Sequence, residues 1–266
     1  MDRAQRANAT IDVLADVPEI LTSASVSLAS IDSIIWSHHH GEHIGDPSLF
    51  PPTTSLVVGP GFPINPDGHL PQSAFEGRDL TELDFSRTDV LKIGGLRVID
   101  WFDDGSLYLL EAPGHAPEHI MALARTSPDK FVLLAGDAAE YPGVIRPSPL
   151  RPLPDTVPSD QVPAFLLERN SAFRTTPFYE PAPAPYVDLV VGRATLAALQ
   201  AFDASPHVLV VLAHDPSFRE PSAHFPAASL ARWEEEAARG EDASAGVHWR
   251  FLREFRKGSL IGPQTA

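Results

Sequence analysis

The densest group of side chains with metal-binding chemistry lies in residues 37–46, Ser-His-His-His-Gly-Glu-His-Ile-Gly-Asp. In an extended or tightly turned segment, His38 and His40 project to the same side because side chains alternate along the backbone. Glu42 and His43 follow within one turn. Imidazole and carboxylate groups are ligands of zinc-type ions in tetrahedral or five-coordinate sites. The segment therefore predicts one arm of a metal site.

Three further motifs each follow a short apolar run. They are Pro113-Gly114-His115, Gly136-Asp137 and Ala213-His214-Asp215, after the apolar runs at 107–111, 131–134 and 208–212. Ligands on loops at strand ends are held by a rigid sheet yet stay open to substrate. The repeated order of apolar run, small residue and then His or Asp predicts that these residues complete the site.

Together these residues suit a site with two metal ions. We expect one ion to be bound by His38, His40 and His115, and the second by Glu42, His43 and His214, with Asp137 bridging both. Two ions about 3.5–4 Å apart would hold a shared hydroxide, lower its pKa toward neutrality and polarise a carbonyl oxygen. The interpretation is a hydrolase in which metal-bound hydroxide attacks the carbonyl, and Asp137 also carries the proton to the leaving group.

The expected substrate is a small, moderately apolar molecule. Two long loops, 60–78 and 141–186, offer aromatic side chains as a wall, and these are Phe62, Phe75, Tyr141, Phe165, Phe178, Tyr179 and Tyr186. Arg146 is a candidate partner for a substrate carboxylate.

Several polar residues have a plain structural interpretation beside the functional one. Asp137 is also a candidate helix N-cap, His214 a strand-end cap, and Glu42 a solvated carboxylate. His39 and His119 are expected to support the site or the core rather than bind metal. For Asp46, closing the turn and bonding a ligand imidazole are equally compatible with the sequence. The remaining histidines, His69, His207, His224 and His248, have no partner at motif spacing and are expected on the surface.

The elements that must position these residues are predicted from apolar periodicity. We expect a helix at 10–24, with Pro18 as an intrusion, strands at 33–36 and 55–58, and a surface loop at 60–78. Further strands are expected at 91–93, 96–99, 107–110, 120–123, 131–134 and 207–212. Helices are expected near 160–170, 187–202 and 227–239, and residues 142–163 form an irregular connection. This order suits a layered α/β domain with helices outside a sheet core.

Composition excludes several classes of function. The chain has 266 residues, with 20 Lys and Arg against 35 Asp and Glu, and a formal net charge of −15. Such a charge repels phosphate backbones and anionic lipid, so we expect neither nucleic acid nor a membrane as partner. No cysteine is present, so thiolate ligands and disulfides are excluded. We find no signal peptide or membrane span in the sequence and expect a cytoplasmic protein.

The motifs in this order resemble the metallo-β-lactamase superfamily. The resemblance rests on His38-x-His40-x-Glu42-His43, Pro113-Gly114-His115, Gly136-Asp137 and Ala213-His214, and it runs from about residue 30 to 218. The segments 35–38 and 45–48 are similar to fungal members related to lactonases, lactamases and thioesterases. The resemblance implies an α/β (α+β) fold, a four-layer αββα sandwich forming a single domain over residues 1–266. It implies zinc, as one or two ions, and hydrolysis of an ester, lactone, thioester or amide (lactam) bond.

The sequence departs from the family pattern in two places. The family has Asp where this chain has Glu42, and the extra methylene moves the carboxylate by about 1.5 Å, one carbon–carbon bond. We therefore expect a second metal that is weaker, differently coordinated or absent. Members usually have about two further strands before the helix at 10–24, so the first sheet is expected to be incomplete. The alternative function is a degenerate member with one metal or none that serves as a binding or scaffold protein.

Overall fold

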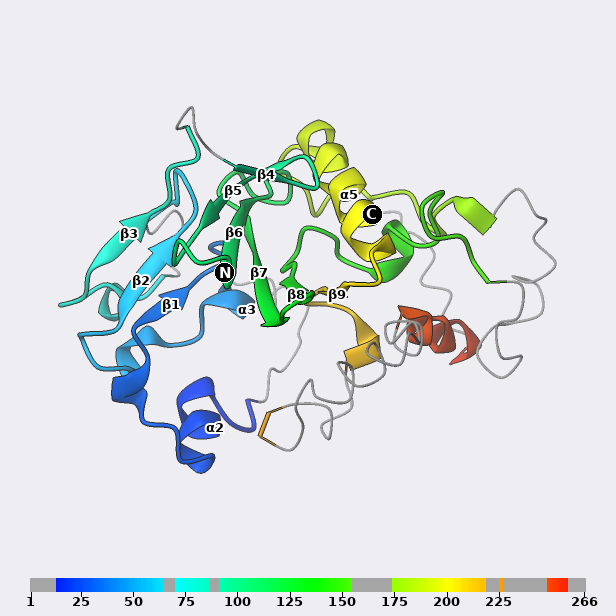
Figure 1. Cartoon of the computed structure of the whole chain (residues 1–266). Coiled ribbons are helices and arrows are strands. Elements are labelled where there is room, and N and C mark those ends of the chain that lie inside the picture. The colour runs from blue at the N-terminus through cyan, green and yellow to red at the C-terminus, as the bar shows by residue number, and fades with distance from the viewer. Residues whose placement is uncertain are drawn as a thin grey trace. The chain divides into compact units, whose positions relative to one another are not determined.

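The computed structural model describes residues 13–64, 70–86, 91–154, 174–218, 225–226 and 248–257. The chain divides into two compact units, residues 1–86 and 87–266. Each unit contains a sheet with helices beside it, which confirms the predicted α/β class (Figure 1). In the described part of the chain, no helix is both long and apolar enough to cross a membrane.

The first unit is built around a parallel sheet in the order β1-β2-β3. Its strands are β1 (Ser33–Ile35), β2 (Ser55–Val58) and β3 (Leu80–Glu82), and its helices are α2 (Val17–Ser23), η1 (Leu28–Ser30), α3 (Gly41–Ile44), η2 (Pro47–Leu49) and η3 (Gln72–Ala74). The predicted strands at 33–36 and 55–58 are confirmed. β3 was not predicted, because all three of its residues are exposed and show no apolar alternation.

The N-terminal helix is shorter than predicted. Of the expected range 10–24, the described residues before Val17 are not helical. Asp16 caps the helix, because its side chain accepts a hydrogen bond from the Glu19 backbone nitrogen at 2.8 Å while Glu19 Oε2 accepts one from the Asp16 nitrogen. Pro18 lies in the first turn, where its missing N–H costs nothing. Pro18 therefore marks the start of the helix and does not interrupt it.

The segment at 60–78 is not a plain surface loop, and that part of the prediction is wrong. Phe62, Leu70 and Ala74 are buried in the core of the first unit with Trp36. The Phe62 ring centroid lies 5.6 Å from that of Trp36, and the Phe75 ring meets the same indole edge-on at 5.8 Å. Proline and glycine content predicted the irregular backbone correctly, but it gave no information on which apolar side chains turn inward.

The second unit contains a mixed sheet in the order β4-β5-β6-β7-β8-β9. Its strands are β4 (Leu91–Ile93), β5 (Leu96–Asp100), β6 (Leu107–Glu111), β7 (Ile120–Ser127), β8 (Lys130–Leu134) and β9 (Val208–Val211). The helices are η4 (Pro142–Val144), α5 (Leu189–Ala204), η6 (Pro216–Phe218) and η8 (Arg250–Lys257). The predicted strands are confirmed here, as is the predicted helix near 187–202. The helices predicted near 160–170 and 227–239 lie outside the described residues.

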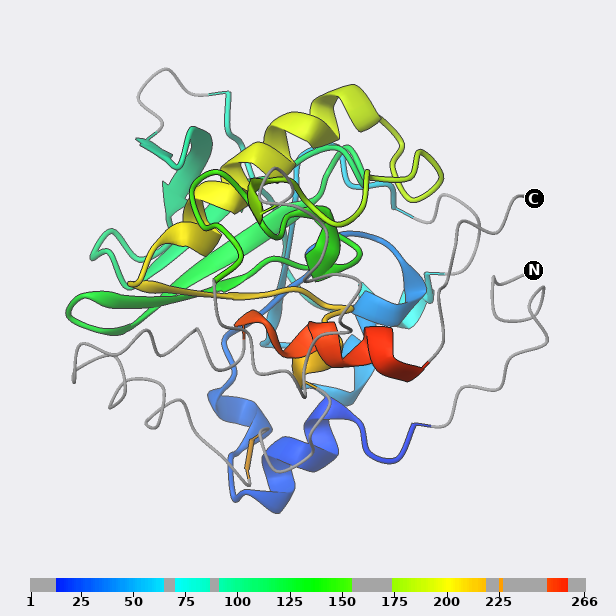
Figure 2. The ribbon, with the colours of Figure 1, turned by 90° about the vertical axis from the view of Figure 1, so that its right-hand side faces the viewer.

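The connection from β8 to β9 explains why α5 lies on the sheet. β4 to β8 pair antiparallel, whereas β8 and β9 pair parallel, and a parallel pair requires a crossover. α5 is part of that crossover and packs Leu199 and Phe202 into the same core as Leu133 and Val210. Figure 2 shows α5 along one face of the sheet. The strand ends after β6, β8 and β9 then carry the predicted site residues of this unit.

Candidate metal centre

The first unit gathers three of its predicted ligands. His38 follows β1 and is fully buried, and its ring centroid lies 4.5 Å from that of His40 and 4.4 Å from that of His43. The predicted alternation along the chain therefore places His38 and His40 side by side. α3 adds His43, whose backbone nitrogen donates to the His40 carbonyl at 3.0 Å. Glu42 lies on the same short helix and is exposed.

Trp36 and Asp46 hold this histidine segment at its two ends. The Trp36 indole, 2% exposed, donates from Nε1 to the Ile44 carbonyl at 2.9 Å and so ties the end of α3 to the core. Asp46 accepts from the backbone nitrogen and the hydroxyl of Ser48, at 3.0 and 2.6 Å. Of the two roles considered for Asp46, the structure shows the one that closes the turn.

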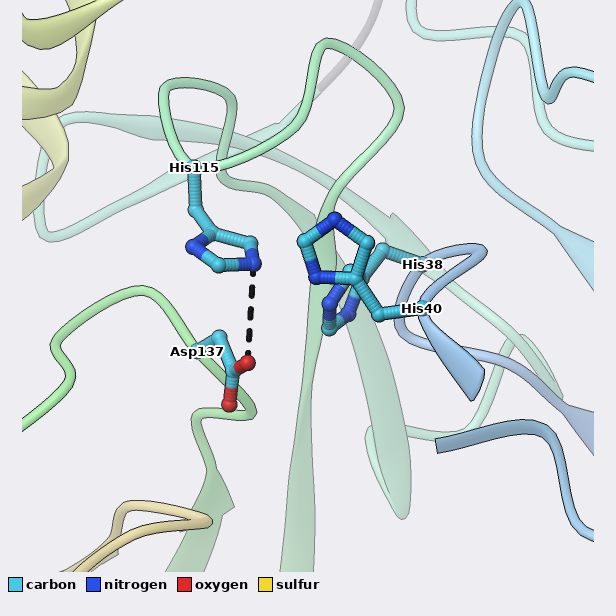
Figure 3. A group of neighbouring side chains, drawn as sticks. All are labelled: His38, His40, His115 and Asp137. Atoms are coloured by element: carbon cyan, nitrogen blue, oxygen red, sulfur yellow. Dashed lines mark ion pairs between the residues drawn. The ribbon is translucent and has the colours of Figure 1, made fainter. Parts of the chain in front are cut away.

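In the second unit, two of the predicted ligands, His115 and His214, lie beside a third, the Asp137 carboxylate. Asp137 Oδ2 lies 3.5 Å from His115 Nε2, and Asp137 Oδ1 lies 3.3 Å from His214 Nε2. Figure 3 shows the His115 and Asp137 side chains facing each other, with His38 and His40 of the first unit also drawn. His115 and Asp137 are buried, whereas the His214 side chain is 43% exposed. Each histidine therefore meets a different oxygen of Asp137.

These distances fit ligands of a zinc-type ion. Two ligand atoms that each lie about 2.0–2.1 Å from a tetrahedrally coordinated ion are about 3.3–3.4 Å apart. The two nitrogen–oxygen distances in the second unit, 3.5 and 3.3 Å, are close to this edge length. The donors are nitrogen and oxygen atoms, as a chain without cysteine requires. The side chains present therefore fit a zinc-class ion in both geometry and chemistry.

The loop that carries His115 is fixed by close packing against α5 and the segment before it. Gly114 has φ +135°, and a Cβ there would lie 2.3 Å from the Cα of Gly192. The Val187 backbone nitrogen donates to the His115 carbonyl at 3.2 Å, and the Thr195 hydroxyl donates to the Pro113 carbonyl at 2.6 Å. The Pro-Gly-His motif is thus defined by a backbone approach that glycine alone permits.

Asp137 is positioned by a residue that the sequence predicted to support the site. His119 is fully buried, and its Nε2 accepts a hydrogen bond from the Asp137 backbone nitrogen at 3.1 Å. This hydrogen bond confirms the supporting role predicted for His119, because it engages Nε2 and holds the backbone at Asp137. Sequence reasoning missed Glu140, whose Oε1 lies 3.1 Å from His115 Nδ1. Its position three residues after Asp137 was the one available signal.

The role predicted for Arg146 is wrong. Its guanidinium is 3% exposed and pairs with carboxylates of the protein itself, at 2.7 Å to Asp203 and 3.4 Å to Asp215. These two carboxylates keep the Arg146 pKa above its ordinary value, although burial acts in the opposite direction. His248, predicted on the surface, is also buried, and its carbonyl accepts from Arg146 at 3.1 Å. His207 is exposed as predicted, while His69 and His224 lie outside the described residues.

Several of the aromatic residues predicted as a substrate wall belong to the core. Phe62 and Phe75 pack on Trp36, while Tyr141 and Phe178 pack around Phe251. Tyr186 is 9% exposed, its ring lies 6.3 Å from that of His115, and its hydroxyl donates to the Ala138 carbonyl at 3.3 Å. Burial raises the pKa of Tyr186, and the carboxylates of Glu140 and Asp137 raise it further, so its hydroxyl stays protonated. Phe165 lies outside the described residues.

Comparison with known proteins shows that the chain is similar in sequence to a metallo-hydrolase and to a gamma-lactamase. No family model matches the chain. The metallo-hydrolase mfmC of Annulohypoxylon moriforme is 38% identical over 271 residues, which covers 94% of this chain and 70% of the relative. The gamma-lactamase FDB1 of Fusarium pseudograminearum is 39% identical over 227 residues, which covers 77% of this chain and 55% of the relative. The match with this chain thus spans 70% of the first relative's length and 55% of the second's.

A solved structure shows the same fold. An N-acyl homoserine lactone hydrolase, with its product bound at a catalytic metal centre, aligns with a TM-score of 0.52 over 79% of this chain and 66% of that protein. The sequence identity in this alignment is 16%, so the likeness concerns the fold alone.

Proposed function

Because the chain belongs to the metallo-β-lactamase superfamily, we propose that it is a metal-dependent hydrolase that opens an ester, lactone, thioester or lactam bond of a small substrate. The observation that carries the proposal is the arrangement around Asp137, whose two oxygens lie 3.5 Å from His115 Nε2 and 3.3 Å from His214 Nε2. A carboxylate that offers one oxygen to each of two imidazoles supports the proposal that Asp137 bridges two metal ions. We also propose that residues 1–266 act as a single domain.

We propose the two ligand sets that the sequence predicts, which share Asp137. The first is His38, His40, His115 and Asp137, and the second is Glu42, His43, Asp137 and His214. When bound, zinc-class ions supply Lewis acidity, which lowers the pKa of water toward neutrality and draws electron density from a carbonyl oxygen. The buried histidines would exclude bulk water from one side of the site. Asp137 would accept a proton at one carboxylate oxygen and deliver it to the leaving group.

A panel of substrates measured beside metal content tests this proposal. We expect about one to two zinc equivalents per chain and turnover of at least one γ-lactam, lactone, ester or thioester. Chelation should abolish the turnover, and added zinc should restore it. The gamma-lactamase among the relatives makes γ-lactams the first substrates to try. A demetallated sample that keeps full activity toward every substrate it cleaves would refute the mechanism.

Neighbouring histidines provide a matched control for the ligand assignment. We expect His40→Ala to lower zinc content and to abolish turnover. His39→Ala changes the adjacent residue of the same type, which is expected to support the site without binding metal, so we expect it to cause a clearly smaller loss of both. Equal losses in the two variants would contradict the assignment, because a general effect on the segment 37–46 would then explain them.

The second candidate function is a binding or scaffold protein with one metal or none. The observation that favours it is Glu42, which is exposed and one methylene longer than the family's Asp. Well under one zinc equivalent per chain, without turnover, would support this alternative. Glu42→Asp separates the two further, since a gain in zinc content together with turnover would identify Glu42 as the cause of a weak second site.

A further inference from the structure

Glu140 lies beside both histidines of the second unit. Its Oε1 is 3.1 Å from His115 Nδ1, and its Oε2 is 4.0 Å from His214 Nε2. The Glu140 side chain is 32% exposed, whereas that of His115 is 1% exposed. The half-buried Glu140 carboxylate thus contacts the Nδ1 side of the buried His115 imidazole. Glu140 is not one of the predicted metal ligands.

The two nitrogens of His115 face two different carboxylates. Nε2 lies 3.5 Å from Asp137 Oδ2, and Nδ1 lies 3.1 Å from Glu140 Oε1. A neutral imidazole carries its proton on one nitrogen and its lone pair on the other. A carboxylate near Nδ1 favours the form with the proton on Nδ1. The lone pair is then left on Nε2, where a cation can accept it.

We infer that Glu140 is a positioning residue that selects the tautomer of His115 and directs its Nε2 lone pair toward the metal. The inference rests on the proposed function, because it assigns His115 as a ligand. Partners of this kind behind a ligating histidine fix the orientation of the ring and raise its basicity. The Tyr186 ring lies edge-on to the same imidazole, with the two ring centroids 6.3 Å apart.

Zinc affinity of the full chain is the first test. Competition against a chromophoric chelator should show that Glu140→Ala weakens binding by about 10- to 100-fold, the usual cost of losing such a partner. Glu140→Gln keeps a side-chain oxygen that could accept a hydrogen bond donated by Nδ1, so it should recover part of the loss. Glu180→Gln is the matched control, because its carboxylate is 84% exposed and contacts Arg193 at 3.5 Å. We expect it to bind zinc as the unchanged chain does.

The tautomer itself is the second readout, and it does not depend on metal. Nitrogen-15 spectra of the metal-free chain, recorded at a pH where His115 is neutral, should show its proton on Nδ1, and in Glu140→Ala the population with the proton on Nε2 should rise. A proton on Nε2 in the unchanged chain, or equal zinc affinity in all variants, overturns the inference. An unchanged chain that binds no zinc refutes the proposed function instead, while the spectra still report on Glu140.

Discussion

Arg146→Met should destabilise the protein far more than the loss of an exposed arginine pair. In the second unit, the Arg146 guanidinium contacts Asp203 at 2.7 Å and Asp215 at 3.4 Å and donates to the His248 carbonyl at 3.1 Å. The side chains of Arg146, Asp203 and Asp215 are at most 4% exposed. Methionine fills much of the same volume but supplies no donor. Two buried carboxylates would therefore lose their cation.

The expected magnitude follows from burial. Removing one partner of a buried ion pair costs about 3–5 kcal/mol, because the remaining charge is left without compensation. Arg97→Met is the matched control, since Arg97 also holds a carboxylate with two contacts, to Glu111, but its side chain is 45% exposed. Such exposed pairs contribute about 0.2–1 kcal/mol. The two variants should thus differ by at least about 2 kcal/mol in free energy of unfolding.

Urea denaturation followed by circular dichroism measures the difference. A second variant, Arg146→Met with Asp203→Asn, should regain part of the lost stability, because it removes one of the uncompensated charges. An Arg146→Met variant within 1 kcal/mol of the Arg97→Met variant would refute the reasoning, since it would mean that the buried carboxylates find other partners or water. Failure of the double variant to regain any stability would show that lost packing, rather than charge, is the cause.

Three further predictions concern pH, backbone space and the histidine segment. Burial, with Arg146 nearby, lowers the pKa of His248 well below its ordinary value, so in acid the unfolded chain binds a proton that the folded chain does not. The free energy of unfolding should therefore fall by up to about 1.4 kcal/mol for each pH unit below about pH 6.5. Urea denaturation at several pH values should show a smaller dependence on pH in His248→Gln. Gly114→Ala should lower stability by about 2–6 kcal/mol, because φ is positive there and the new Cβ would lie 2.3 Å from the Gly192 Cα. Gly41→Ala, where a Cβ meets nothing within 4 Å, should be neutral or stabilising. Equal melting temperatures for the two variants would contradict this prediction. Trp36→Phe should lower the free energy of unfolding, measured with urea, by about 1–3 kcal/mol, because it leaves the Ile44 carbonyl at the end of α3 without its donor. A loss below about 0.5 kcal/mol would contradict the importance of this hydrogen bond.

Local patterns predicted most of the second sheet. Its strands are short apolar runs bounded by turns, as at Gly94-Gly95 between β4 and β5, where both glycines have positive φ. The motif histidines and Asp137 follow such strands directly, so spacing along the chain was enough to propose them. β3 lacked this signal, because Leu80, Thr81 and Glu82 are all exposed and the strand is defined by parallel pairing with β2.

Interactions between distant parts of the chain account for the failures. Arg146 was interpreted as a substrate contact because its partners, Asp203 and Asp215, lie 57 and 69 residues further along the chain. No sequence pattern around Arg146 predicts these two ion pairs. Glu140 illustrates the same limit within the site itself. It lies close to Asp137 in sequence, yet its significance depends on His115, which the fold brings to within 3.1 Å of it. Sequence spacing can propose which residues bind a metal, but which groups orient those ligands depends on the tertiary packing. Mutation of Glu140 is therefore more informative than mutation of a metal ligand, because it changes the orientation of His115 while His115 itself stays present.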